Sequence, residues 1–338
     1  MLWVAGFALA ILIAGVGSAW LLFGAAIKPS SDIQFKVTSG DSLRPVLQRL
    51  EKLGVIRFPR LLYVYGRIIR TTGVKRGIYF FDSSKPMTMS EILARLNKGD
   101  ILQGQITIIE GHDRWQVRDQ LVRNGWLSAA EFDAFCDDLA FLQAHQIPGP
   151  SCEGYLAPDT YRVALQIDPG SLFAIFFDRY RQRFESVSEQ GDGPLHLTER
   201  QLVTLASIVE KETGQPSERA RIACVFYNRL RKKPAWKLQT DPTVIYARKL
   251  SEEGFDGNIR RKDLQMNHPY NTYAKEGLPP GPIANPGRAA LEAVISPIEC
   301  RDYFFVAMDA CGSHQFCPDI ACHSRAVQHW QLNRRKRK

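Results

Sequence analysis

The chain begins with 27 residues that carry no charged side chain, MLWVAGFALAILIAGVGSAWLLFGAAI, and Lys28 is the first charged residue. About 20 consecutive apolar residues are enough to cross the hydrocarbon core of a bilayer. The sequence therefore predicts a transmembrane helix over residues 1–27. A cleaved signal peptide is the alternative, but the run has no basic residue at its start and exceeds the roughly 7–15 apolar residues usual for such peptides.

The whole chain of 338 residues is 45% apolar and 23% charged, which is ordinary for a folded protein. At roughly 100–200 residues per domain, this length predicts two domains. The net charge of +9 includes basic runs at 229–233 and 333–338. Such runs can bind nucleic acid, but an apolar anchor argues against that partner. We therefore expect no nucleic acid, and a solvated basic tail at 333–338.

A small unit of mixed helices and strands is expected over residues 33–102. Phe35 and Val37 alternate as in a strand, and Ser39-Gly40-Asp41 is typical of a turn. Apolar residues at helical spacing follow and end at Gly54. Further elements are expected as a helix at 59–70, a strand at 77–81 and a helix at 90–97. The opening FKVTSGDSL resembles LysM-type glycan-binding modules, so we expect a LysM-like subdomain.

A larger domain is expected over residues 105–332. Its expected elements are strands at 106–109 and 303–307, and helices at 114–124, 132–145, 170–183 and 326–332. Segments dense in turn residues, at 238–244, 269–273 and 277–283, are expected to be loops, because proline and glycine disfavour helices and central strands. The mixture of segregated helices and strands predicts the α+β class.

One helix of the larger domain carries two glutamates, Glu210 and Glu212, two residues apart. Thr198 and Gln201 fit a capping box, so a helix is expected to begin there. With Leu205 at zero and about 100° per residue, Glu212 falls at about 340°, among the apolar positions, and Glu210 at about 140°. The spacing therefore predicts that Glu212 faces the core and that Glu210 faces largely away.

A carboxylate on an apolar helix face is costly unless it is paired or protonated. Burial raises the pKa of a carboxyl group, and a raised pKa is what a general acid needs near neutral pH. Glu212 is therefore a candidate catalytic acid. The spacing leaves open the alternative that Glu212 forms a salt bridge with Arg219 or Arg229 and only holds helices together.

The chain has seven cysteines, and the sequence does not decide whether they form disulfides. If they do, the odd number leaves at least one thiol without a partner. The cysteines are Cys136, Cys152, Cys224, Cys300, Cys311, Cys317 and Cys322. The last three lie with two histidines in CGSHQFCPDIACH, which could in principle bind zinc. No CxxC pair is present, so we predict no metal site. Disulfides in an oxidising compartment are an alternative, and we expect mainly unpaired structural cysteines.

Several segments in one order resemble the MltG/YceG-like family of endolytic murein (peptidoglycan) transglycosylases. They are EGYLAPDTY (153–161), LVTLASIVEKETG (202–214), SERARIACVFYNRL (217–230), LQTDPTVIY (238–246), YNTY (270–273), GLPPGPIANPG (277–287) and YFFVA (303–307). Their combination over this length is far more specific than any single segment.

The resemblance implies a single-pass protein of the bacterial inner membrane with its catalytic body, a YceG-like domain, in the periplasm. It implies cleavage inside peptidoglycan glycan strands, between N-acetylmuramic acid and N-acetylglucosamine. The product would carry a 1,6-anhydro end, and the cut would terminate nascent strands, with penicillin-binding protein synthases as partners. The family's catalytic residue is the second glutamate of Glu-Lys-Glu, here Glu212. No metal or cofactor is implied.

As a hypothesis, Glu212 protonates the glycosidic oxygen, and its carboxylate then accepts the proton of the muramic acid C6 hydroxyl, which attacks C1 of its own ring. The attack is intramolecular, so one carboxyl group suffices. Candidate sugar contacts are Gln239, Thr240, Asp241, Asn271 and Tyr273. Two alternatives are a hydrolase that uses Glu212 and Asp241 as its two carboxylates, and a non-catalytic, membrane-tethered glycan-binding scaffold built on the LysM-like unit.

Overall fold

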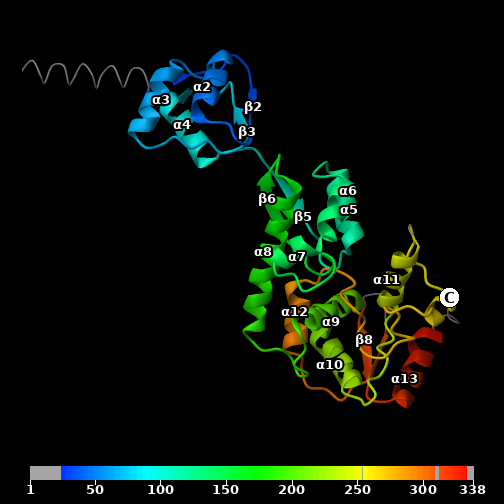
Figure 1. Cartoon of the computed structure of the whole chain (residues 1–338). Coiled ribbons are helices and arrows are strands. Elements are labelled where there is room, and N and C mark those ends of the chain that lie inside the picture. Colours follow the sequence, from blue (N-terminus) through cyan, green and yellow to red (C-terminus); the bar gives the residue numbers. More distant parts are fainter. Residues whose placement is uncertain (1–23, 253, 309–311, 333–338) are drawn as a thin grey trace, which may run out of the picture. The chain divides into compact units, whose positions relative to one another are not determined.

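The computed structural model describes residues 24–252, 254–308 and 312–332 (Figure 1). Contacts within the chain separate two compact units. Unit 1 extends to Gln105 and includes Arg162–Ile167, while unit 2 consists of Ile106–Tyr161 and the chain from Asp168 onward. The expected basic tail at 333–338, and residues 1–23 of the expected anchor, lie outside the described residues.

Unit 1 folds around a pair of antiparallel strands and three helices. Its elements are β1 (Ala26–Ile27), β2 (Ile33–Val37), α2 (Leu43–Lys52), α3 (Pro59–Ile68), β3 (Gly77–Phe81), β4 (Met87–Thr88) and α4 (Met89–Lys98). β2 pairs with β3, so that Phe35 lies opposite Tyr79. Buried side chains of both strands and of all three helices form one hydrophobic core. The elements expected from the sequence in this unit are confirmed, with ends shifted by at most two residues.

The end of the apolar N-terminal run belongs to unit 1. Ala26 and Ile27, which we expected at the end of a transmembrane helix, form β1 and pair with β4. Ile27 is buried in the core of the unit. Within the described part of the chain, no helix has the length and apolarity needed to cross a membrane. The transmembrane helix and the LysM assignment therefore stay predictions.

Unit 2 is mainly helical and contains one small antiparallel sheet. Its helices are α5 (Arg114–Arg123), α6 (Ala129–Cys136), α7 (Leu139–Ala144), α8 (Pro169–Ser188), α9 (Glu199–Glu212), α10 (Arg219–Leu230), α11 (Asp241–Ser251), α12 (Arg288–Ile295) and α13 (Ile320–Val327). Short helical turns are found at Pro216–Glu218, Asp263–Gln265 and Gln328–Leu332. In this sheet, β7 (Phe304–Ala307) pairs with β8 (His314–Cys317). β5 (Gln103–Thr107) pairs with β6 (Thr160–Ala164), and the division between the two units falls within these two strands. The mixed class is as expected.

Three expectations for the elements of unit 2 were wrong. The last helix, expected at 326–332, begins earlier, because α13 covers Ile320–Val327 and only a short helical turn follows at Gln328–Leu332. The helix expected at 132–145 is divided into α6 and α7, because Asp138 caps a new helix by accepting hydrogen bonds from the backbone of Ala140 and Phe141. The loop expected at 238–244 contains the start of α11. Pro242 is tolerated there because the first helical turn does not use its missing N–H group.

Helix α9 lies at the centre of unit 2, in contact with α10, α11 and α12 (Figure 1). The predicted capping box is confirmed: Thr198 accepts from the backbone of Gln201, and Gln201 from the backbone of Thr198. Every residue from Leu202 to Val209 is buried. This middle part of α9 therefore has no solvent face, whereas Lys211 in its last turn is exposed.

Disulfides join six of the seven cysteines, so the expectation of mainly unpaired cysteines was wrong. The pairs are Cys136–Cys152, Cys224–Cys300 and Cys317–Cys322, and Cys311 lies outside the described residues. Pairing requires Cα atoms to approach within about 7 Å, which depends on the tertiary fold and cannot be read from sequence spacing. Among the described residues, no group of His, Cys, Asp and Glu side chains could hold a metal ion.

Candidate active site

Glu212, the last residue of α9, lines a cavity of about 480 Å³ in unit 2. The cavity draws its walls from α10, from the segment before α11, and from the β7–β8 sheet with α13. Its lining consists of Glu212, Arg229, Leu238, Gln239, Asp241, Tyr273, Phe304, Phe305, Val306, Ala307, His314, Ile320, His323, Val327 and Gln331. Four of the six residues predicted for the site, Glu212 among them, therefore meet in one cavity.

The pKa of the Glu212 carboxyl is raised from 4.5 to about 7. Burial is the largest cause, and the negative charge of Asp241 adds to it. The Thr240 hydroxyl and the positive charge of Arg229 act in the opposite direction. Near neutral pH, both the protonated and the ionised form of Glu212 are thus populated, as a group that acts first as an acid and then as a base requires.

Arg229 fixes the side of the cavity formed by α10. Its Nη1 donates to the backbone oxygen of Leu238 at 2.6 Å, and its Nε to that of Tyr303 at 2.7 Å. The guanidinium lies 5.2 Å from the centre of the Phe304 ring, which suits a cation–π contact. No ion pair joins Arg229 to Glu212 in the described chain, so its positive charge acts on Glu212 without neutralising it by direct contact.

Asp241 and Tyr273 form a hydrogen-bonded pair at the cavity. The Tyr273 hydroxyl donates to Oδ1 of Asp241 at 2.7 Å. Gln239 lies nearby with φ of +53°, a left-handed conformation that is uncommon for residues other than glycine. Its backbone N–H donates to the oxygen of Thr272 at 3.2 Å, which helps to hold this conformation. These three side chains are placed to contact a ligand in the cavity.

Thr240 and Asn271 are not in the cavity lining. Thr240 is buried beside Glu212, and its backbone N–H donates to Oγ1 of Thr272 at 3.0 Å. The Asn271 side chain is fully buried: Nδ2 donates to the backbone oxygens of Leu264 and Met266 at 3.1 and 2.7 Å. Its Oδ1 accepts from the backbone of Tyr273 at 2.9 Å. Asn271 therefore holds the loop that presents Tyr273, and its amide is not available to a sugar.

Glu210 lies in a different environment from Glu212. Its Oε1 accepts from Nη2 of Arg219 at 3.0 Å, and the two side chains are only 6% and 10% exposed. Its Oε2 accepts from the backbone of Gly287 at 3.0 Å. The prediction that Glu210 faces largely away from the core was wrong, because Arg219 and the backbone of Gly287 cover this side of α9. The salt bridge considered for Glu212 is made by Glu210 instead.

The sequence analysis did not identify the aromatic and histidine wall of the cavity. Phe304 and Phe305 come from β7, and His314 comes from β8. Nδ1 of His314 lies 2.7 Å from Oε2 of Glu218, and its backbone N–H donates to Oε1 of Glu218 at 2.9 Å. This contact ties the wall to the turn between α9 and α10. The YFFVA strand pattern was the available signal for the wall, but it does not reveal the partner strand.

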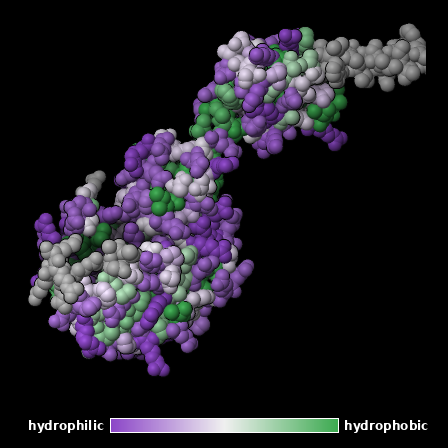
Figure 2. Space-filling view, turned by 180° about the vertical axis from the view of Figure 1, so that it is seen from behind, coloured by the Kyte–Doolittle hydropathy of each residue, from purple (hydrophilic) through white to green (hydrophobic). Residues whose placement is uncertain are grey.

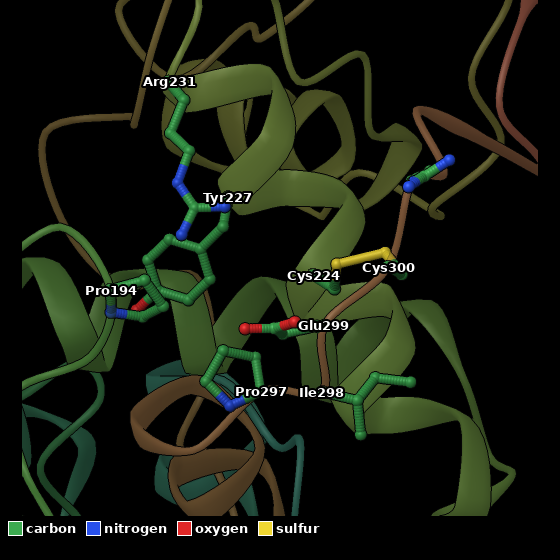
Figure 3. A pocket seen from close by; sticks show the side chains of 9 residues that line it. Pro194, Cys224, Tyr227, Arg231, Pro297, Ile298, Glu299 and Cys300 are labelled. Atoms are coloured by element: carbon green, nitrogen blue, oxygen red, sulfur yellow. A yellow bond between two sulfur atoms is a disulfide. The ribbon is translucent and has the colours of Figure 1, made fainter.

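A second cavity in unit 2, of about 580 Å³, lies beside the Cys224–Cys300 disulfide (Figure 3). Tyr227 of α10 and Arg231, directly after α10, line one side of it, and Glu299 lies on the opposing segment. Glu299 is exposed to solvent, whereas Glu212 is partly buried. We therefore place the candidate site at Glu212.

The sequence model of the YceG-like family matches residues 35–329. An endolytic murein transglycosylase of Bacillus subtilis is 28% identical over 93% of this chain and 90% of its own length. One from Streptococcus pneumoniae is 26% identical over 86% of this chain, which spans only 57% of that longer relative. The crystal structure of a putative yceG-like protein from Listeria monocytogenes shares the fold, with a TM-score of 0.58 and 27% identity, covering 87% of this chain and 99% of that one.

The fold and the cavity define an α+β protein with a central helix that ends in a partly buried acid. The chain belongs to the YceG-like family, because the match covers most of its length.

Proposed function

We propose that the protein is a peptidoglycan lytic transglycosylase that cuts glycan strands internally, with Glu212 as its general acid and base. The related proteins of known name support the reaction class. The observation that carries the assignment to this residue is the raised pKa of Glu212 in a cavity. A carboxyl group that is protonated near neutral pH can donate its proton to a leaving oxygen.

In the proposed reaction, protonated Glu212 donates its proton to the oxygen between N-acetylmuramic acid and N-acetylglucosamine. The C1–O bond breaks, and positive charge develops at C1 and the ring oxygen of the muramic acid. The C6 hydroxyl of the same ring attacks C1, and the Glu212 carboxylate accepts its proton. This regenerates the acid and leaves a 1,6-anhydro ring. Because the attacking group belongs to the substrate, no water has to be positioned.

Charges around the cavity suit both halves of this cycle. Arg229 stabilises the Glu212 carboxylate that forms after proton donation, since opposite charges favour the ionised form. The Asp241 carboxylate opposes that ionisation, and its negative charge would also stabilise positive charge on the sugar ring. Gln239 and Tyr273 are proposed sugar contacts, whereas Thr240 and Asn271 are proposed to position them.

We also propose a periplasmic location for the two units, with residues 1–23 in the inner membrane. The three disulfides support an oxidising compartment, because cytosolic thiols are kept reduced. The uncharged N-terminal run supports the anchor. In this proposal, the cut terminates the nascent glycan strands that penicillin-binding protein synthases elongate.

A digestion of purified murein, with products read by mass spectrometry, tests this function. We expect fragments longer than disaccharides whose new ends are lighter by one water than hydrolysed ends. Hydrolysed ends would instead support the hydrolase that uses two carboxylates. That alternative deserves the test because Asp241 lines the same cavity as Glu212. Binding to murein without any cleavage would support the non-catalytic scaffold.

A further inference from the structure

Helix α3 of unit 1 exposes apolar side chains on the face that points away from the core. Leu61, Val64 and Ile68 are 46%, 53% and 75% exposed. They recur three and four residues apart, so they form one stripe along the helix. The opposite face of α3 is buried, and it packs so closely at Gly66 that an added Cβ would lie 2.9 Å from the backbone oxygen of Thr71. The outer stripe is therefore not needed for the core of unit 1.

Exposed apolar residues also flank α3 in the sequence. Phe58 before the helix and Ile69 after it are 49% and 45% exposed, and Leu53, at the end of α2, is 43% exposed. Apolar side chains of unit 1 are visible at the surface in the space-filling view of Figure 2. An isolated exposed leucine needs no explanation, but several exposed apolar side chains at helical spacing on one helix mark a surface for contact.

The segment that carries the stripe has charged residues of one sign. From Lys52 to Phe81, both included, the sequence contains seven lysines and arginines and no aspartate or glutamate. Arg57, Arg60, Arg67 and Arg70 are all exposed. In the described part of the chain, none of these four arginines forms an ion pair. A helix with an apolar stripe bordered by unpaired arginines is suited to an anionic lipid surface, where apolar groups enter the headgroup region and arginines meet phosphates.

We propose that α3 of unit 1 lies on the membrane surface, with Leu61, Val64 and Ile68 between anionic lipid headgroups and Arg57, Arg60, Arg67 and Arg70 around them. Lipid is the expected partner because the positive charge of these arginines complements anionic headgroups, and because unit 1 directly follows the uncharged N-terminal run. It rests on the membrane attachment proposed above, and it adds a second, peripheral contact that would restrict how unit 1 moves relative to the bilayer.

The test uses the full chain in liposomes with the single reporter substitution Val64→Trp, which places an aromatic ring suited to the interface in the stripe. The liposomes contain brominated phosphatidylglycerol, whose acyl chains quench tryptophan on contact. The parent chain gives the signal of the natural tryptophans, which is subtracted. The matched control is Gln34→Trp, at an exposed position of β2. In Figure 1, β2 and α3 lie on different sides of unit 1.

We expect quenching of the tryptophan at position 64 and none of that at position 34. Replacing anionic lipid by phosphatidylcholine should reduce the quenching. Arg60→Gln combined with Arg67→Gln should also reduce it, because each basic residue at an anionic surface changes the local partition roughly five-fold. Lysines at both positions should restore it, since they keep the charge.

The failures of this proposal and of the membrane anchor are distinguishable. If the chain floats with the liposomes but the tryptophan at position 64 is quenched no more than that at position 34, the anchor stands and the α3 contact is overturned. If the chain does not float with anionic liposomes, both are overturned. Equal quenching in phosphatidylcholine and phosphatidylglycerol would overturn the role given to the arginines.

Discussion

Glu210 and Arg219 form a buried ion pair at 3.0 Å, only two residues before the partly buried acid Glu212. Arg219 begins α10, so the pair joins the end of α9 to the start of the next helix. The backbone N–H of Gly287, at the start of α12, also donates to Glu210. Glu210 thus holds three elements around the point where Glu212 enters the cavity.

Breaking this pair should destabilise the fold. Removing one partner of a buried ion pair leaves an uncompensated charge, so Glu210→Ala should lower the free energy of unfolding by about 3–5 kcal/mol. Urea denaturation followed by circular dichroism measures this. The matched control is Glu212→Ala, which breaks no direct ion pair and should cost much less. Equal losses in the two variants would contradict the division of roles.

The pKa of Glu212 predicts a pH-dependent stability. The folded pKa of about 7 lies above the ordinary value of 4.5, so the folded chain binds this proton more tightly than the unfolded chain. Its contribution is present below pH 4.5 and is lost as pH rises to about 7. Glu212→Gln does not titrate, so its advantage over the parent in free energy of unfolding should grow to roughly 1–3 kcal/mol above pH 7. An advantage independent of pH would contradict the raised pKa.

The Tyr273 hydroxyl should matter more for the substrate than for the fold. Tyr273→Phe removes the hydrogen bond to Asp241, which is 2.7 Å long and accepted by a charged group. A hydrogen bond to a charged group contributes about 1.5–3 kcal/mol to stability when it is buried, but this one is exposed, so the melting temperature should change little. Loss of the hydroxyl as the proposed sugar contact, and of its hold on Asp241, should lower kcat/KM roughly 10- to 100-fold. Steady-state kinetics on a soluble glycan substrate would measure it. The control is Tyr303→Phe. Arg229 donates a hydrogen bond to the backbone oxygen of Tyr303 and not to its hydroxyl, so this change should leave kcat/KM near that of the parent.

The Cys224–Cys300 disulfide should stabilise the cavity wall. It closes a separation of 76 residues and ties α10 to the segment that leads into β7. Cys224→Ala with Cys300→Ala should lower the free energy of unfolding by roughly 2–5 kcal/mol. The comparison is Cys317→Ala with Cys322→Ala, where the separation is five residues and the entropic loss should be smaller. A larger loss in the second variant would contradict this account.

Local chemistry made parts of the fold predictable. The capping box at Thr198 sets the start of α9 without help from the rest of the chain, and the strand at 77–81 has a clear pattern. The position of Glu212 at the cavity could also be predicted, because apolar spacing and the family resemblance agreed. The same spacing failed for Glu210, since a helical wheel does not show that Arg219 and the backbone of Gly287 cover its side of the helix.

Other features depend on contacts between distant segments, so sequence spacing does not reveal them. β8 is recognisable only through its pairing with β7, and it brings His314 to the cavity. Asn271 has the composition of a sugar contact, but backbone oxygens of residues 263–266 occupy its amide. The disulfides likewise reflect tertiary proximity, not spacing.

The role of Glu212 is tested most directly by comparing the parent chain with Glu212→Gln, which keeps the shape of the side chain but cannot exchange a proton. Both proteins are incubated with purified murein, bound protein is measured by co-sedimentation, and released fragments are read by mass spectrometry. We predict that Glu212→Gln binds murein like the parent and releases no 1,6-anhydro fragments. Release of such fragments at the parent's rate would contradict the assignment of Glu212 as the general acid and base.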